Sequence, residues 1–243
     1  MYGLIYKNFL VNKKIILLHT GIFIFMYAIS VMPVVTNDET TASLMPTVER
    51  FVSIISIISS FMIIGSLETA IFEPDERKKW AYFISCTEAG CKAETGAKYL
   101  TIYIISTVST VLSMIIISVI SDFSGAQPVY DLCIFTYMFQ LFLRAVEIPF
   151  IFRFGMKMGN NVRGIIYMTG LLIAVIYFLF GDLSAFGTVD DMWEKFFALF
   201  DTGLNPKIVI VLSVAGLLVI PLYYLSYKIS CKLFMKGVDN YER

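Results

Sequence analysis

The sequence predicts an all-α membrane protein in which residues 1–243 form one domain with six transmembrane helices. The chain is 58% hydrophobic and only 16% charged, and its mean hydropathy is +0.76, whereas a soluble domain carries about a quarter charged residues. Its charges gather between apolar runs that have the roughly 20 residues needed to cross a bilayer. Six runs qualify as spans: 15–35, 51–72, 99–120, 132–152, 164–180 and 208–227.

The positions of lysine and arginine predict the orientation of these spans. Segments 1–14, 73–98, 153–163 and 228–243 carry fifteen of the 19 basic residues, whereas the three alternate loops carry Arg50, Lys195 and Lys207. Both termini and the 73–98 loop are therefore expected in the cytoplasm. The first run is too long for a cleaved signal peptide, so it is expected to be a retained helix. The formal net charge is zero, which gives no reason to expect a nucleic-acid partner.

Residues 1–14 are expected to form an amphipathic elbow helix in the membrane interface, the alternative being a frayed terminus. Its polar side carries Lys7, Asn8 and Lys14, and its apolar side carries Tyr2, Ile5, Tyr6, Phe9 and Leu10. In the first span, His19 is expected to be a hydrogen-bonding group rather than a proton relay.

The 73–98 loop carries ten charged residues between two apolar runs. Pro74 and the acids after it suit the first turn of a helix, and apolar and aromatic positions then recur at helical spacing. Residues 87–90 are expected to break this helix, and a second one runs from about Cys91 through Lys98 into the third span. The pattern predicts a charged helical hairpin that displays aromatic residues at the membrane surface. The alternative is a solvated loop whose positive charge only sets the orientation.

Three charged residues fall inside predicted spans. Arg144 and Glu147 are three residues apart on one helical face, where they can neutralise each other. Pro149 follows them and is expected to free a backbone carbonyl and kink the helix. Glu68 lies about one turn from the cytoplasmic boundary, where it is expected to pair structurally, for example with Arg77, or to act as a functional carboxylate. Whether the three residues contact a substrate or only stabilise the bundle stays open.

Two further segments carry weaker signals. Gly155 and Gly159 match a small-xxx-small packing motif, but they are interpreted as a tight turn at the cytoplasmic rim. The outer loop 181–207 is expected to hold an amphipathic helix, either a passive anchor or a gate. Its apolar face includes Trp193, Phe196, Phe197 and Phe200.

The chain shows no catalytic or cofactor signature. It has no glycine-rich phosphate loop and no nucleophile elbow, so it is not expected to use ATP by itself. With one histidine and four cysteines at unrelated spacings, a metal site is not expected. Cys86 and Cys91 fall in the reducing cytoplasm by the predicted topology, where a structural disulfide is not expected.

The order of these parts resembles a known family. The chain opens with MYGLIYKNFLVNKK, carries an acidic-basic-Trp segment at 73–80, enters the third span through Lys98, Tyr99 and Leu100, and has a Pro149-to-Gly159 stretch after the fourth. It resembles, over nearly its whole length, the permease subunit of type-2 ABC exporters. It is most similar to the small bacterial six-span kind, such as exporters of phenol-soluble modulin peptides. Members often have a Leu-Pro-x-Ser/Thr-Arg turn where this chain has residues 87–91, in which Gly90 is able to make the turn.

The resemblance implies a half-transporter of the bacterial cytoplasmic membrane that is not an enzyme by itself. Two permeases, identical or related, would pair and bind two ATPase subunits, which would hold the ATP and magnesium. The cargo would be amphipathic, antimicrobial or cytolytic peptides. The ATPase would grip the 73–98 loop as a coupling helix, through Asp75, Glu76, Arg77, Lys79, Trp80, Phe83, Ile84, Thr87 and Glu88.

Two other functions compete with this one. The first is an intramembrane enzyme that uses Glu68, Arg144 and Glu147 as an acid-base set, which requires the three to converge in one water-filled cavity. The second is a scaffold subunit without a translocation path.

Overall fold

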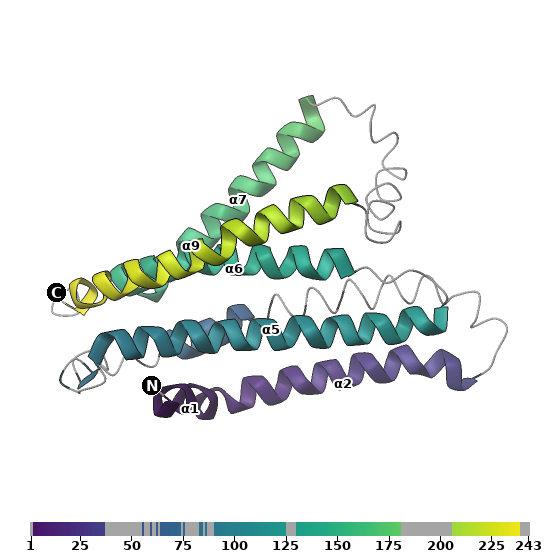
Figure 1. Ribbon diagram of the computed structural model, residues 1–243, viewed down its shortest axis with the longest axis horizontal. Coiled ribbons are helices and arrows are strands. Elements are labelled where there is room, and N and C mark those ends of the chain that lie inside the picture. The colour runs from purple at the N-terminus through teal and green to yellow at the C-terminus, as the bar shows by residue number, and fades with distance from the viewer. Residues whose placement is uncertain are drawn as a thin grey trace.

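The computed structural model describes residues 2–36, 55, 59, 62, 64–73, 75, 83–84, 86, 90–124, 130–180 and 206–238, and within these ranges it is helical with no strand. Helices α1 and α2 begin the chain, and α5 begins within the 73–98 segment, at Gly90 (Figure 1). The bounds are α1 Tyr2–Val11, α2 Lys13–Thr36, α5 Gly90–Ser124, α6 Tyr130–Phe154, α7 Met156–Phe180 and α9 Pro206–Val238. The all-α prediction is confirmed for these residues.

The helices are arranged as a bundle of long, nearly parallel rods. In Figure 1, α2 and α5 lie along one side and α6 and α9 along the other, and α7 diverges from α6 and α9 toward its C-terminal end. Helix α1 begins and α9 ends at the same end of the molecule. The basic residues of both segments make this the end that the sequence predicts to be cytoplasmic.

Three described helical stretches are long and apolar enough to cross a membrane: Gly90–Val119, Tyr130–Phe154 and Leu212–Phe234. Helices α1 and α2 together would add a fourth, bent by 66°. These four overlap the predicted spans 15–35, 99–120, 132–152 and 208–227. Most of residues 51–63 and all of 181–205 lie outside the described residues, and with them Trp193, Phe196, Phe197 and Phe200, so six spans and an outer amphipathic helix stay predictions.

The bend between α1 and α2 occurs at Asn12. Its side chain donates to the Asn8 carbonyl oxygen at 2.7 Å, and Asn8 in turn bonds Thr101 of α5 at 3.4 Å. Asn8 is buried, whereas Tyr2 and Tyr6 are exposed. The polar side of α1 thus faces the bundle and the tyrosines face outward, as suits a helix lying in a membrane interface.

The turn between α6 and α7 is tighter than predicted. Gly155 has φ +87°, a conformation that glycine adopts without steric cost, and α7 begins one residue later, at Met156. The interpretation of Gly155 as a turn agrees with this conformation. Residues 156–163, by contrast, were expected as a loop and are the first two turns of α7.

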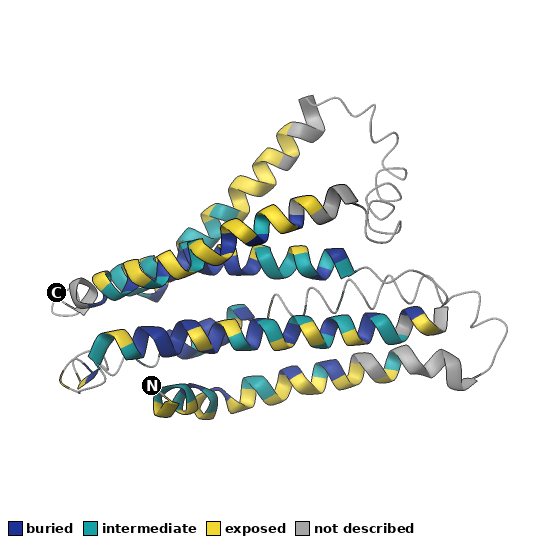
Figure 2. Ribbon diagram, in the orientation of Figure 1, coloured by how far each residue is buried: buried dark blue, intermediate teal, exposed yellow. Residues whose placement is uncertain are grey.

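The segment 64–73 forms the centre of the described core. Ile64, Leu67 and Ile71 of this segment cluster with Ile102 of α5 and Ile148 of α6. Apolar residues that face away from this centre on α2, α7 and α9 are largely exposed (Figure 2). A bundle with apolar residues both inside and outside is typical of a protein whose outer surface meets lipid.

Candidate functional site

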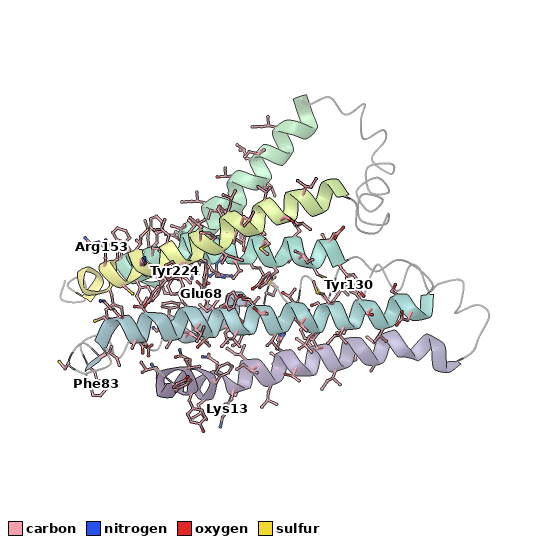
Figure 3. The ribbon with its side chains drawn as sticks, in the orientation of Figure 1. Lys13, Glu68, Phe83, Tyr130, Arg153 and Tyr224 are labelled. Atoms are coloured by element: carbon pink, nitrogen blue, oxygen red, sulfur yellow. The ribbon has the colours of Figure 1, made fainter. Side chains whose placement is uncertain are left out.

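Four charged side chains meet inside the bundle, and they come from three helical segments. Glu68 lies on segment 64–73, Arg144 and Glu147 lie on α6, and Arg163 lies on α7. The first three side chains are 0 to 1% exposed and Arg163 is 17% exposed. Two carboxylates and two guanidiniums give the cluster a formal charge of zero. Figure 3 labels Glu68, which lies among side chains inside the bundle.

The contacts in this cluster are cross-linked rather than pairwise. Arg144 Nη1 donates to an oxygen of Glu68 and to Glu147 Oε2 at 2.5 Å. Arg163 donates from Nε to Glu147 Oε1 at 2.9 Å and from Nη2 to Glu68 Oε2 at 2.6 Å. Each arginine therefore holds both carboxylates. A planar guanidinium has five N–H donors in a fixed fork, which suits this bridging role.

The turn at Gly155 explains why Arg163 reaches Glu147. Both residues are eight positions from Gly155, one on each side, so the α6–α7 hairpin brings them to the same level. Ile151 and Gly159 are each four positions from Gly155, and a Cβ at Gly159 would overlap Ile151 Cγ1. The missing side chain at Gly159 thus permits the close approach of α6 and α7. Gly159 acts as a packing residue, contrary to its interpretation as part of the turn.

The missing side chain at Gly65 leaves space for the guanidinium groups of Arg144 and Arg163. A Cβ at this position would lie 3.2 Å from Arg163 Nη1 and 3.8 Å from Arg144 Nη2. The glycine is one turn before Glu68 on the same helical face. Segment 64–73 therefore supplies both a carboxylate and the space for its partners.

The structure brings Glu68, Arg144 and Glu147 together, which is one of the two requirements of the enzyme hypothesis, and it adds a fourth member; the water-filled cavity stays a prediction. Arg163 was counted with the loop charges, because helix α7 was expected to begin later. The sequence does contain a signal for Arg163: it is as many residues after Gly155 as Glu147 is before it. The expected partner of Glu68, Arg77, lies outside the described residues, and Glu68 contacts Arg144 and Arg163 instead.

The contacts of this cluster link segment 64–73, α6 and α7 to one another. Three of its four carboxylate oxygens accept hydrogen bonds from guanidiniums, and neither arginine is a general base at any ordinary pH. Glu68 Oε1 and Arg144 Nε are buried without a partner among the described residues.

A second charged group, here called the loop-base junction, lies where the 73–98 loop leaves the core. It consists of Lys7 of α1, Asp75, and Glu94 and Lys98 of α5. Asp75 bonds Lys7 at 3.0 Å and Lys98 at 2.8 Å, and Glu94 lies 3.5 Å from Lys7 and 3.9 Å from Lys98. Like the first cluster, the junction has two positive and two negative members.

Lys98 anchors the junction to the apolar core. Its Nζ lies 4.4 Å from the centroid of the Phe72 ring and 5.8 Å from that of Phe152, so cation–π attraction adds to the ion pairs. Burial opposes ionisation of Asp75, but Lys98 and then Lys7 outweigh it and lower the pKa of Asp75 below its usual value. The junction therefore joins α1, the loop and α5 while all its members are charged.

The predicted ATPase-contacting residues differ in their placement. Asp75 points inward to the junction and Ile84 is 3% exposed, whereas Phe83 is 60% exposed and labelled at the turn before α5 in Figure 3. Gly90 begins α5 with φ +63°, as expected for the end of the turn. The remaining predicted contacts lie outside the described residues: Glu76, Arg77, Lys79, Trp80, Thr87 and Glu88.

Hydrogen bonds between helices complete the polar interior. His19 of α2 bonds Ser109 of α5 at 2.7 Å, in agreement with its interpretation as a hydrogen-bonding group. Tyr99 of α5 bonds Ser226 and Ser230 of α9, both at 2.7 Å. These bonds tie α5 to the helices on either side of it.

Comparisons with known proteins give one family. Residues 3–235 match the family model described as "ABC-2 family transporter protein". No curated protein and no solved structure matches the chain.

Proposed function

Because the chain belongs to the ABC-2 family of transporter proteins and is thus a membrane permease of an ABC transporter, we propose that a separate ATPase drives it through the 73–98 loop. The permease is a transport component and not itself an enzyme. ATP and magnesium would bind in the ATPase. The working unit would contain two ATPase subunits and two permeases, in a bacterial cytoplasmic membrane with both permease termini on the ATPase side.

The loop-base junction is the observation that carries this proposal. A force applied to the loop must pass through its base, and Asp75 there bonds Lys7 of α1 and Lys98 of α5. Because ion pairs at hydrogen-bond distance resist separation, displacement of the loop would move α1 and α5 with it. This supports rigid-body transmission of ATPase closure into the bundle.

The buried four-charge cluster would extend that rigid body. It joins segment 64–73, which leads into the loop, to α6 and α7. Segment 64–73 would then transmit the same movement to the opposite half of the bundle. The enzyme alternative is less well supported, because Arg163 engages both of the carboxylates that such chemistry would need.

We further propose that the cargo is an amphipathic peptide and that transport is outward. Resemblance to small bacterial peptide-exporter permeases supports the cargo class. Exposed aromatic and methionine side chains, such as Phe142 and Met168, offer surface to apolar side chains of a peptide.

Helix α1 is proposed to be an elbow helix that lies in the membrane interface. The burial of its polar side against the bundle and the outward position of its tyrosines support this placement.

The coupling role is tested by replacing Phe83 with alanine. With the permease and its ATPase reconstituted in proteoliposomes, Phe83→Ala should lower the affinity of the two subunits roughly tenfold, because a buried aromatic anchor contributes at least 1 kcal/mol to an interface. Phe25→Ala is the matched control, since Phe25 is 64% exposed on α2 and far from the loop. Equal binding and ATP turnover in both variants would contradict the coupling proposal.

Transport is tested in the same proteoliposomes with a fluorescent amphipathic helical peptide as cargo. ATP-dependent movement of the peptide across the membrane is expected. ATP turnover without peptide movement would contradict the proposal of a peptide cargo. Absence of both activities would favour the scaffold alternative.

A further inference from the structure

A groove follows α9 on the outside of the bundle, and its character changes along its length. Two adjoining hollows of about 290 and 380 Å³ share Leu225 and Ile229 as lining residues. They therefore lie next to each other along α9, and together they are here called the α9 groove. One half is apolar and the other is basic.

The apolar half lies between α6 and α9. Pro149 and Phe150 of α6 form one wall, and Leu222, Leu225 and Ile229 of α9 form the other. Leu225 and Ile229 are exposed on the outer surface of the bundle. A surface of this kind would meet the hydrocarbon part of the bilayer.

The basic half lies between the start of α5 and the end of α9. Lys92 of α5 and Lys228 and Lys232 of α9 line it, and its lining contains no acidic residue. No ion pair among the described residues involves these three lysines. Lys228 Nζ lies 4.7 Å from the ring centroid of Tyr224, which is labelled in Figure 3. Within the described part of the chain, no carboxylate thus neutralises these three positive charges.

The length of the groove matches one leaflet of a membrane. Leu222 and Lys232 are ten residues apart on a continuous helix, which spans about 15 Å, and the hydrocarbon core of a bilayer is about 30 Å thick. Lys92 is near the start of α5 and Lys228 and Lys232 are near the end of α9, and these two helix ends lie at the end of the molecule where α1 begins (Figure 1). That end is the one predicted to be cytoplasmic.

We propose that the α9 groove binds an anionic phospholipid. Its phosphate would lie against Lys92, Lys228 and Lys232, and one acyl chain would lie between α6 and α9 toward the bilayer centre. Basic pockets beside membrane helices on the cytoplasmic side are suited to anionic headgroups, and a zwitterionic headgroup would gain much less from three unpaired lysines. The inference concerns lipid binding and does not depend on cargo or on the ATPase.

The test measures binding of fluorescent phosphatidylglycerol to the purified full-length chain in detergent, without the ATPase. The double variant Lys228→Gln/Lys232→Gln should weaken binding about 30-fold, since each lysine contributes about 1 kcal/mol near an anionic headgroup. Lys13→Gln/Lys14→Gln is the matched control, because both lysines are exposed at the start of α2 and are predicted to lie on the same side of the membrane. The control should bind as the unaltered chain does.

Three further measurements identify the ligand. Phosphatidylcholine with the same acyl chains should bind at least tenfold more weakly, and inorganic phosphate should not compete at millimolar concentration, because it has no acyl chain to occupy the apolar half. Leu222→Trp should fill the apolar half, which alone it lines, and weaken lipid binding while leaving all three lysines in place. A fluorescent amphipathic peptide should not be displaced by phosphatidylglycerol.

The proposal would be overturned if Lys228→Gln/Lys232→Gln and Lys13→Gln/Lys14→Gln weakened phosphatidylglycerol binding equally. That result would indicate attraction of the lipid to basic residues in general. Equal binding of both lipids, competition by phosphate, or displacement of the peptide would also overturn it. Thermal unfolding midpoints of the variants would show whether each one folds. The transport proposal would survive any of these results.

Discussion

Arg163 completes the charge balance in the bundle interior. Without it, Glu68, Glu147 and Arg144 would leave one buried negative charge, and a bundle interior offers little solvation for an unpaired ion. Its Nε and Nη2 reach both carboxylates at 2.5 to 2.9 Å. A lysine in this place would keep the charge but lose the fork that holds two acceptors at once.

Replacing Arg163 should therefore destabilise the bundle. Arg163→Ala is expected to lower the free energy of unfolding by about 3 to 5 kcal/mol, because it leaves an uncompensated buried carboxylate, and Arg163→Lys should cost less. Thermal unfolding of the purified protein in detergent measures both. Adding Glu147→Gln to Arg163→Ala restores neutrality and should recover part of the loss. Arg153→Ala, at the partly exposed end of α6, should change stability by less than about 1 kcal/mol.

Asp75 should make the loop-base junction sensitive to acid. Its pKa is lowered in the folded protein because Lys98 and Lys7 outweigh the effect of burial. Its ionised form therefore adds stability above the ordinary pKa of 3.8, and this contribution is lost as the pH falls below that value toward the folded-state pKa.

Asp75→Asn should lower the free energy of unfolding by about 1 to 3 kcal/mol at pH 7, because it leaves two lysines with a neutral partner. The difference from the unaltered chain should be constant from pH 7 to about pH 4 and shrink at lower pH. Unfolding midpoints measured from pH 7 to pH 3 check this. A difference that grows on acidification would contradict the assigned role.

At the scale of elements, the α6–α7 hairpin is set by two glycines with different tasks. Gly155 adopts φ +87° and reverses the chain, while Gly159 has ordinary helical geometry and leaves space for Ile151. Close approach at Gly159 lies one turn from the Arg163–Glu147 contact. Packing and ion pairing in this hairpin are therefore coupled.

An added methyl group at Gly159 should separate the two helices. Gly159→Ala is expected to cost about 1 to 3 kcal/mol of stability by overpacking against Ile151. Gly164→Ala is the matched control on the same helix, since a Cβ there meets nothing within 4 Å, and it should stabilise by up to about 1 kcal/mol. Unfolding midpoints give both values. Ile151→Ala combined with Gly159→Ala should lose less than the sum of the two single changes.

At the scale of the whole molecule, charged groups of the described helices gather at one end of the bundle. The loop-base junction, the start of α1 and the basic half of the α9 groove all gather at the end where α1 begins and α9 ends (Figure 1). When Arg163 is counted with the bundle interior instead of with a loop, the predicted cytoplasmic segments carry fourteen basic residues and the predicted outer loops carry three. The predicted orientation is unchanged by this correction.

The native cysteines provide a test of that orientation. Cys86 is exposed in the 73–98 loop, while Cys133 is buried. A membrane-impermeant maleimide should label the chain in inside-out vesicles and not in intact cells, and Cys86→Ser should remove most of this labelling. Labelling of Cys86 from outside intact cells would place the loop on the wrong side for an ATPase.

The sequence by itself determined the all-α membrane class, because apolar runs of spanning length leave no soluble alternative. It also predicted the contact between Arg144 and Glu147 and the break at Gly90, because an i, i+3 spacing and a glycine turn depend only on local backbone geometry. It did not identify the partners of Glu68 or Asp75. Those partners are 23 to 95 residues away along the chain.

Only the tertiary structure decided which opposite charges from different helices meet. With 19 basic and 19 acidic residues, local spacing leaves many pairings open, and selection among them depends on how each helix turns and crosses its neighbours. The reversal at Gly155 aligned Arg163 with Glu147, and the bend at Asn12 brought α1 alongside α5, where Lys7 meets Asp75. Such geometry follows from the packing of whole helices against one another, which local spacing along the chain does not determine.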